Sequence, residues 1–226
     1  MTITTTKLTR AAGLAAAAGG VLYIAVQINH PQLDAAFAMT TEYAVREAAK
    51  IVMTVLSLIG ITGIYLRQVS RVGRIGLIGY AYLALGYLAI LCVQVVGLFV
   101  LPTLAASQPG YVNDVFAVVT SGTPTGDIGA LQILIQGGIA YIVGGTIFGI
   151  TLFRAHVLPR WAAALLSVGA LATLAASQLP QVTQRLFAIP VGIALIGLGY
   201  ALWREQRTAR LRISAVSSEP DSARAK

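Results

Sequence analysis

The sequence is short of the residue types from which most catalytic and metal sites are built. It has one cysteine, two histidines and eight acidic residues among 226. Because Cys92 stands alone, the chain can form neither an intramolecular disulfide nor a site of paired thiolates. It also lacks a His-Glu-x-x-His pair, a Gly-x-Ser-x-Gly elbow, a glycine-rich phosphate loop and an aspartate-rich repeat for magnesium and diphosphate. We therefore expect no metal site and no cofactor.

Charge is scarce as well. Charged residues make up 11% of the chain and hydrophobic residues 57%, whereas roughly a quarter of a soluble domain is charged. A membrane-spanning helix needs about 20 mostly apolar residues. Six stretches meet that need approximately: 11–28, 44–66, 75–101, 128–153, 161–177 and 186–203. They predict an all-α polytopic membrane bundle of six transmembrane helices over residues 1–203. A basic, disordered tail is expected over 204–226.

The cations predict the orientation of this bundle. Of the 16 lysines and arginines, only Arg46, Lys50 and Arg185 fall on one side of the predicted spans. The others fall on the opposite side: Lys7, Arg10, Arg67, Arg71, Arg74, Arg154, Arg160, Arg204, Arg207, Arg210, Arg212, Arg224 and Lys226. The positive-inside rule then places both termini in the cytoplasm of a bacterial cell, with the chain in the inner membrane.

This distribution also bears on partners. The net charge of +8 indicates topology first, so we expect no nucleic acid. The basic tail is expected to contact anionic lipid headgroups. The first stretch follows Lys7 and Arg10 and could belong to a signal peptide. Its apolar core runs to Ile28, which is long enough for a span, so we expect it to be retained.

Small residues and one long connection add detail to the prediction. Gly145 and Gly149 have the spacing that lets helices approach closely in lipid, and we expect them to pack within one bundle. A homo-oligomer contact is the alternative. The connection 102–126 is expected to be extracytoplasmic, with a short helix over 111–120. Asp127 is expected to cap the fourth span.

Charged residues inside a span are costly, so they are the best available indication of a functional site. Glu42, Arg46 and Lys50 share one stripe of the second predicted helix, at about 100° per residue, and Glu47 is adjacent. Polar residues are expected at matching depth on other helices: Gln27, His30, Gln94, Gln132 and Gln136. If these faces converge, they form an outward-facing polar vestibule.

Two interpretations of the charged residues stay open. Glu42 with Arg46, and Glu47 with Lys50, have the spacings of helical ion pairs that simply neutralise each other. Alternatively, the vestibule binds or transports a small amphiphile or anion, with His30 or Glu47 as a proton-coupling group. Other candidate functions are an accessory subunit that packs against a partner membrane protein, and an intramembrane enzyme acting on a lipid or isoprenoid. In the enzyme, Glu42 or Glu47 would be the general acid–base.

One part of the chain resembles a known group of proteins. The resemblance is carried by Gly144-Gly145-Thr146-Ile147-Phe148-Gly149 and by Phe153-Arg154-Ala155-His156-Val157-Leu158-Pro159-Arg160-Trp161. These segments, with the apolar span that follows, resemble small six-span bacterial membrane proteins of unassigned function. The alanine-rich sequence and the preference for arginine over lysine are typical of actinobacteria. The resemblance implies a six-helix membrane fold and no particular activity.

Overall fold

The computed structural model describes residues 4–123, 125–176, 179, 183 and 185–217. These residues form helices and turns, and no strand is found among them. The bundle is made of α1 (Thr5–Ala25), α3 (Thr41–Phe99), α7 (Ile139–Ala155), α8 (Arg160–Ala176) and α10 (Ala188–Ser217). Shorter elements are α2 (Ala35–Ala38), α4 (Leu101–Ser107), α5 (Pro109–Ser121), α6 (Leu131–Gln136) and η1 (Arg185–Phe187). The predicted all-α class is confirmed for the described residues.

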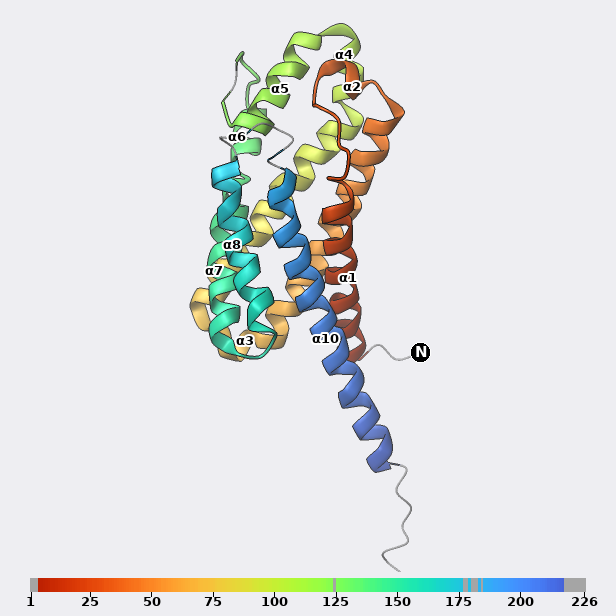
Figure 1. Ribbon diagram of the computed structural model, residues 1–226, viewed down its shortest axis with the longest axis vertical. Helices are drawn as coiled ribbons and strands as arrows, with labels where there is room; N and C mark the ends of the chain where they lie inside the picture. The colour runs from red at the N-terminus through yellow and green to blue at the C-terminus, as the bar shows by residue number, and fades with distance from the viewer. Residues whose placement is uncertain (1–3, 124, 177–178, 180–182, 184, 218–226) are drawn as a thin grey trace, which may run out of the picture.

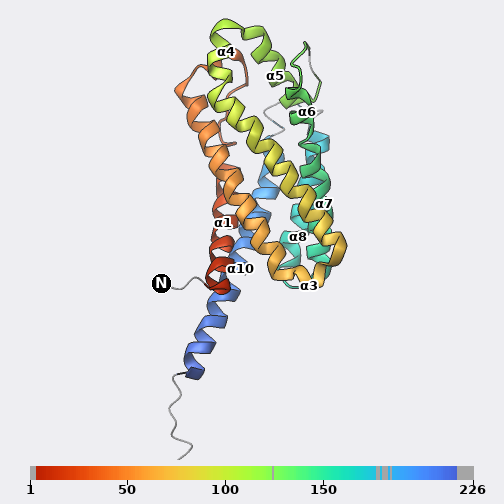
Figure 2. The same cartoon turned by 180° about the vertical axis from the view of Figure 1, so that it is seen from behind.

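Helix α3 is a hairpin of two antiparallel halves. A straight helix of its 59 residues would be about 90 Å long, roughly three times the thickness of a bilayer core. At Gly73 the backbone has φ 59° and ψ −159°, a conformation that only glycine adopts readily. The chain reverses there, and residues 41–72 run beside residues 74–99 (Figure 2). The first half contains the predicted span 44–66, and the second half contains the predicted span 75–101 as far as Phe99.

The described residues include several helices suited to a membrane. Four are long and apolar enough to cross one: Thr5–Ala25, Thr41–Phe99, Leu131–Ala155 and Arg185–Glu205. Helix Arg160–Leu174 is apolar but shorter. The protein therefore has the long apolar helices of a membrane protein.

Capping side chains account for several helix starts. Thr4 accepts a hydrogen bond from the Lys7 amide at 3.3 Å, so α1 begins before the predicted residue 11.

The expectation that Asp127 caps the fourth predicted span was wrong. Its carboxylate accepts from the Gly129 amide at 2.8 Å in a turn, and α6 begins only at Leu131. The helix expected over 111–120 is present as α5.

Small residues pack inside the bundle, as expected for the fourth predicted span. A methyl group built on Gly145 would lie 2.8 Å from the Ala170 side chain. One built on Gly149 would lie 2.7 Å from the Ala163 carbonyl oxygen. Both glycines thus face α8 of the same chain. The prediction that this face packs within one bundle is confirmed.

The two ends of the bundle differ (Figure 1). One end holds the start of α1, the Gly73 turn and the turn between α7 and α8, and α10 projects beyond it. The described part of the predicted tail belongs to α10 as far as Ser217, and residues 218–226 lie outside the described residues. The opposite end is covered by α2, α4, α5 and α6, which pack around buried Phe37, Tyr43 and Phe116. We call this the capped end.

Candidate functional site

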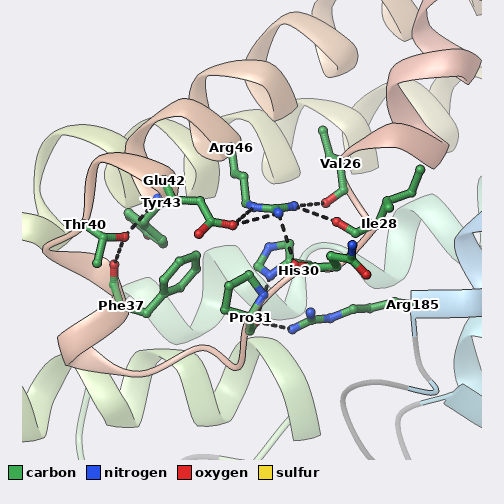
Figure 3. A network of polar contacts seen from close by, with 11 residues as sticks. Val26, Ile28, His30, Pro31, Phe37, Thr40, Glu42, Tyr43, Arg46 and Arg185 are labelled. Carbon is green, nitrogen blue, oxygen red and sulfur yellow. Dashed lines mark hydrogen bonds and ion pairs between the residues drawn. The ribbon is translucent and has the colours of Figure 1, made fainter.

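Arg46 fastens the chain that leaves α1. Its guanidinium donates to the carbonyl oxygens of Val26 at 3.1 Å, Ile28 at 3.2 Å and Asn29 at 3.1 Å. It also donates to the Glu42 carboxylate at 2.8 Å, as the helical spacing predicted (Figure 3). These carbonyls lie at the end of α1, where helix carbonyls lack partners within the helix. Arg46 therefore acts as a structural clamp on this loop.

Glu47 and Lys50 form the second predicted ion pair. The Lys50 ammonium donates to Glu47 Oε1 at 2.5 Å. Glu47 is buried, and Lys50 keeps only 17% of its side-chain surface exposed. One turn further along α3, Thr54 donates to Gln94 Oε1 at 2.9 Å across the hairpin. The two halves of α3 thus bring Glu47, Lys50 and Gln94 together, as the vestibule hypothesis expected of them.

These three side chains line a cavity of about 250 Å³ at the capped end. The remaining walls are mostly apolar and come from the second half of α3, from α5 and from α6. They include Ile90, Val115, Phe116, Val119 and Leu134. The volume is close to the lower limit of about 300 Å³ for small-molecule sites. An apolar chamber with one polar end can hold a molecule that has an apolar part and a polar head.

Gly97 makes room for the polar end of the cavity. A methyl group added to it would lie 3.1 Å from the Tyr43 hydroxyl and 3.3 Å from Glu47 Oε2. Both oxygens therefore approach the backbone of the second half of α3. Tyr43 itself is buried, with its ring edge-to-face against Phe116 at a centroid distance of 6.0 Å. The aromatic contact positions the hydroxyl beside the ion pair.

Two other candidates lie in a different pocket. Gln27 and His30 line a space of about 320 Å³ between the end of α1 and the start of α10, together with Arg185. Neither residue lines the cavity of Glu47 and Lys50. The single vestibule expected from the sequence is therefore divided into two separate spaces. We call them the central cavity and the Arg185 pocket.

The glutamines of the fourth predicted span take no part in either space. Gln132 is half-buried and Gln136 is exposed, and neither lines the central cavity or the Arg185 pocket. Helix α6 presents Leu131, Leu134 and Ile135 to the central cavity instead. The short helix is turned so that its apolar face, not its amide face, meets α3 and α5.

The vestibule hypothesis drawn from the sequence did not include Arg185 among its residues. Arg185 was counted only as a cation on the outer side, yet its guanidinium donates to the Pro31 carbonyl oxygen at 2.7 Å (Figure 3). Pro31 is 154 residues away in the chain. The one available signal was its rarity, as one of three cations on that side of the predicted spans.

His30 is neutral at neutral pH. Burial is the main reason that its pKa falls from 6.5 to about 4, and the charge of Lys50 lowers it further. Nδ1 lies 2.8 Å from the Pro31 carbonyl oxygen, which can only accept, so Nδ1 carries the proton. Nε2 is then an acceptor. A ring that is already neutral well below pH 7 does not favour the proton-coupling role expected for it.

Comparisons of the chain with protein-family models, with curated proteins and with solved structures find no match.

Proposed function

We propose that the chain crosses a bacterial inner membrane six times, with the capped end outside and both termini in the cytoplasm. The two halves of α3 provide two of the crossings. The cations support this orientation, because Lys7 near the start of α1, Arg71 beside the Gly73 turn and Arg154 near the end of α7 lie at the end opposite the capped end. We call this end the basic end.

Cysteine labelling in intact cells tests the orientation. Ser70 lies just before the Gly73 turn and Ser121 is the last residue of α5, so these two exposed residues mark opposite ends of the bundle. Cys92 would first be replaced by serine. A membrane-impermeant maleimide is expected to label Ser121→Cys and to leave Ser70→Cys unlabelled until the cells are lysed. Labelling of Ser70→Cys in intact cells would contradict the proposed orientation.

We propose further that the central cavity binds a single-chain amphiphile whose head accepts hydrogen bonds, such as a fatty acid. The observation that carries this proposal is a desolvated ion pair, Glu47–Lys50, at one end of an apolar chamber. Ionisable groups at membrane depth are costly and most often serve a site. Apolar side chains would have occupied the same space without that cost.

The free donors of the cavity indicate the chemistry of the head. One N–H of Lys50 is used by Glu47, which leaves two. Gln94 accepts from Thr54 through its oxygen, and its amide nitrogen has no partner among the described residues. Donors on Lys50 and Gln94 suit a head that accepts hydrogen bonds. The Glu47 carboxylate alongside disfavours a doubly charged anion through like-charge repulsion.

The interior of the bundle favours retention of the amphiphile in the cavity over its conduction through the bundle. Beyond Thr54 and Ser57, the next large side chains that are fully buried in the first half of α3 are Ile61 and Ile64, and the buried amide of Gln68 follows only nearer the Gly73 turn. An apolar layer therefore lies between the cavity and the basic end. The enzyme alternative gains less support, since the one carboxylate in the cavity lining is held by an ammonium group.

Native mass spectrometry of the protein, released gently from its own membrane, tests the proposal. We expect a discrete bound amphiphile on the wild type, and its loss by at least tenfold in Val119→Phe, which fills the cavity from α5. Val119 lines the cavity but is 43% exposed, so the variant should fold.

Val168→Phe is the matched control. Val168 is 62% exposed on α8 and does not line the cavity, so this variant should keep the ligand. A wild-type protein without any bound amphiphile would contradict the proposal. Equal occupancy in Val119→Phe and Val168→Phe would contradict it as well.

A further inference from the structure

The Arg185 pocket gathers polar groups at a helix junction. It is lined by Gln27, Asn29, His30 and Arg185, with Ile24 and Ile189 as apolar walls. At about 320 Å³ it is somewhat larger than the central cavity. It lies where α1 ends and α10 begins, at the same end of the bundle as the capping helices (Figure 1).

The positive charge of Arg185 in this pocket is not balanced by any carboxylate among the described residues. Arg46, Lys50 and Arg185 all act electrostatically on His30. Arg46 is paired with Glu42 and Lys50 with Glu47. Among the described residues, no carboxylate pairs with Arg185. Within the described part of the chain, the half-buried guanidinium of Arg185 therefore has no counter-charge.

Several hydrogen-bonding groups of the pocket are also unused. The side-chain amides of Gln27 and Asn29 have no partner among the described residues. Arg185 uses one of its five N–H groups on Pro31. Because neutral His30 carries its proton on Nδ1, the ring adds no positive charge of its own. The pocket thus offers free hydrogen-bond donors from Gln27, Asn29 and Arg185, and the Arg185 guanidinium has no carboxylate partner among the described residues.

We propose that the Arg185 pocket binds a phosphate group, held by the Arg185 guanidinium and the amides of Gln27 and Asn29. Arginine suits this group, because its planar fork can donate two parallel hydrogen bonds to phosphate oxygens. The apolar walls, Ile24 and Ile189 among them, leave room for the first carbons of an attached chain. Two sources share this chemistry: the head of an anionic phospholipid and free phosphate.

This inference uses the membrane placement proposed above but not the ligand of the central cavity. In that placement, Arg185 and His30 lie where headgroups of the outer leaflet would be. Filling the central cavity with Val119→Phe should leave the Arg185 pocket unchanged, since Val119 does not line it. An experiment can therefore contradict the proposal for one of the two sites without contradicting the proposal for the other.

The two histidines provide a site-resolved measurement. His30 lines the pocket, whereas His156 lies in the turn between α7 and α8 at the opposite end and reports on lipids bound there. The purified chain, labelled with ¹⁵N-histidine in a neutral detergent, would be titrated with phosphatidylglycerol and followed by NMR. A bound phosphate should shift the His30 ring signals and raise the pKa of His30 from about 4, because an anion favours the imidazolium.

Arg185→Gln should weaken the apparent affinity reported by His30 at least tenfold. Arg71→Gln makes the same change of charge at an exposed position at the basic end and should leave that affinity unchanged. If inorganic phosphate added without lipid shifts the His30 ring signals, and if it also displaces phosphatidylglycerol, the pocket is a free-phosphate site. If inorganic phosphate does neither and phosphatidylglycerol still shifts the His30 signals, the pocket is a lipid site.

Two results would overturn the proposal. One is a His30 signal that responds to neither probe while His156 responds to phosphatidylglycerol. The other is an unchanged His30 response in Arg185→Gln. Circular dichroism of each variant would show whether the helical fold is intact.

Discussion

Gly86→Ala is expected to cost several kcal/mol of stability, although it adds only one methyl group. That carbon would lie 2.2 Å from the Tyr141 backbone nitrogen and 2.4 Å from its Cα atom. No side-chain rotation relieves a clash with backbone, so the second half of α3 and α7 must move apart. Overpacking of a core typically costs about 1–3 kcal/mol, and backbone clashes lie at or above the upper end.

Displacement of these helices should also disturb the tyrosines beside Gly86. The rings of Tyr87 and Tyr141 meet edge-to-face at 5.3 Å, and Tyr23 donates to the Tyr141 hydroxyl at 3.1 Å. We expect the unfolding midpoint in detergent, followed by circular dichroism, to fall by about 10 °C, at 2–4 °C for each kcal/mol. Gly110→Ala is the control, because nothing lies within 4 Å of its added methyl group. A midpoint in Gly86→Ala equal to that of Gly110→Ala would show that α3 and α7 are not in close contact.

Lys50→Met is expected to destabilise the protein by about 3–5 kcal/mol, because it leaves the buried Glu47 carboxylate without its counter-charge. The double variant Glu47→Leu/Lys50→Met should recover most of that loss. It replaces a buried ion pair by apolar groups of similar size, which is often neutral or stabilising. Thermal unfolding of both variants in detergent measures the difference.

The double variant separates a structural role of the pair from a role in binding. If the pair holds the head of an amphiphile, the double variant should be stable and yet lose the ligand in native mass spectrometry. A stable double variant with full ligand occupancy would remove Glu47 and Lys50 from the site. A single Lys50→Met variant as stable as the wild type would mean that Glu47 is well hydrated.

Much of the helical arrangement could be predicted from residues close together in sequence. The apolar stretches predicted the long helices, since each must bury or immerse its own apolar surface. Glu42–Arg46 and Glu47–Lys50 were predictable as pairs, because i,i+4 and i,i+3 side chains are neighbours on any helix. Gly73, between two arginines in the second predicted connection, is where the chain turns back.

The partners of the candidate site residues were less predictable. A polar stripe on one helix indicates that some polar surroundings exist, but it does not say which helix supplies them. Gln27 and Gln94 were both expected in one vestibule, and they lie in different spaces. Gln132 and Gln136 were expected there too, but the rotation of α6 turns an apolar face inward. Helix rotation depends on packing against several neighbours at once.

Local composition is enough to predict that this chain forms apolar helices with its cations concentrated at one end, because helix formation and burial of apolar surface depend on residues close together in the chain. What Arg46, Lys50 and Arg185 do depends instead on how the helices pack in the tertiary structure. Arg46 reaches carbonyls up to 20 residues earlier, and Arg185 reaches Pro31 across 154 residues. Such contacts depend on how α1, α3 and α10 pack. Their packing makes Arg46 a clamp, places Lys50 in a cavity and leaves Arg185 as a cation without a carboxylate partner in the described part of the chain.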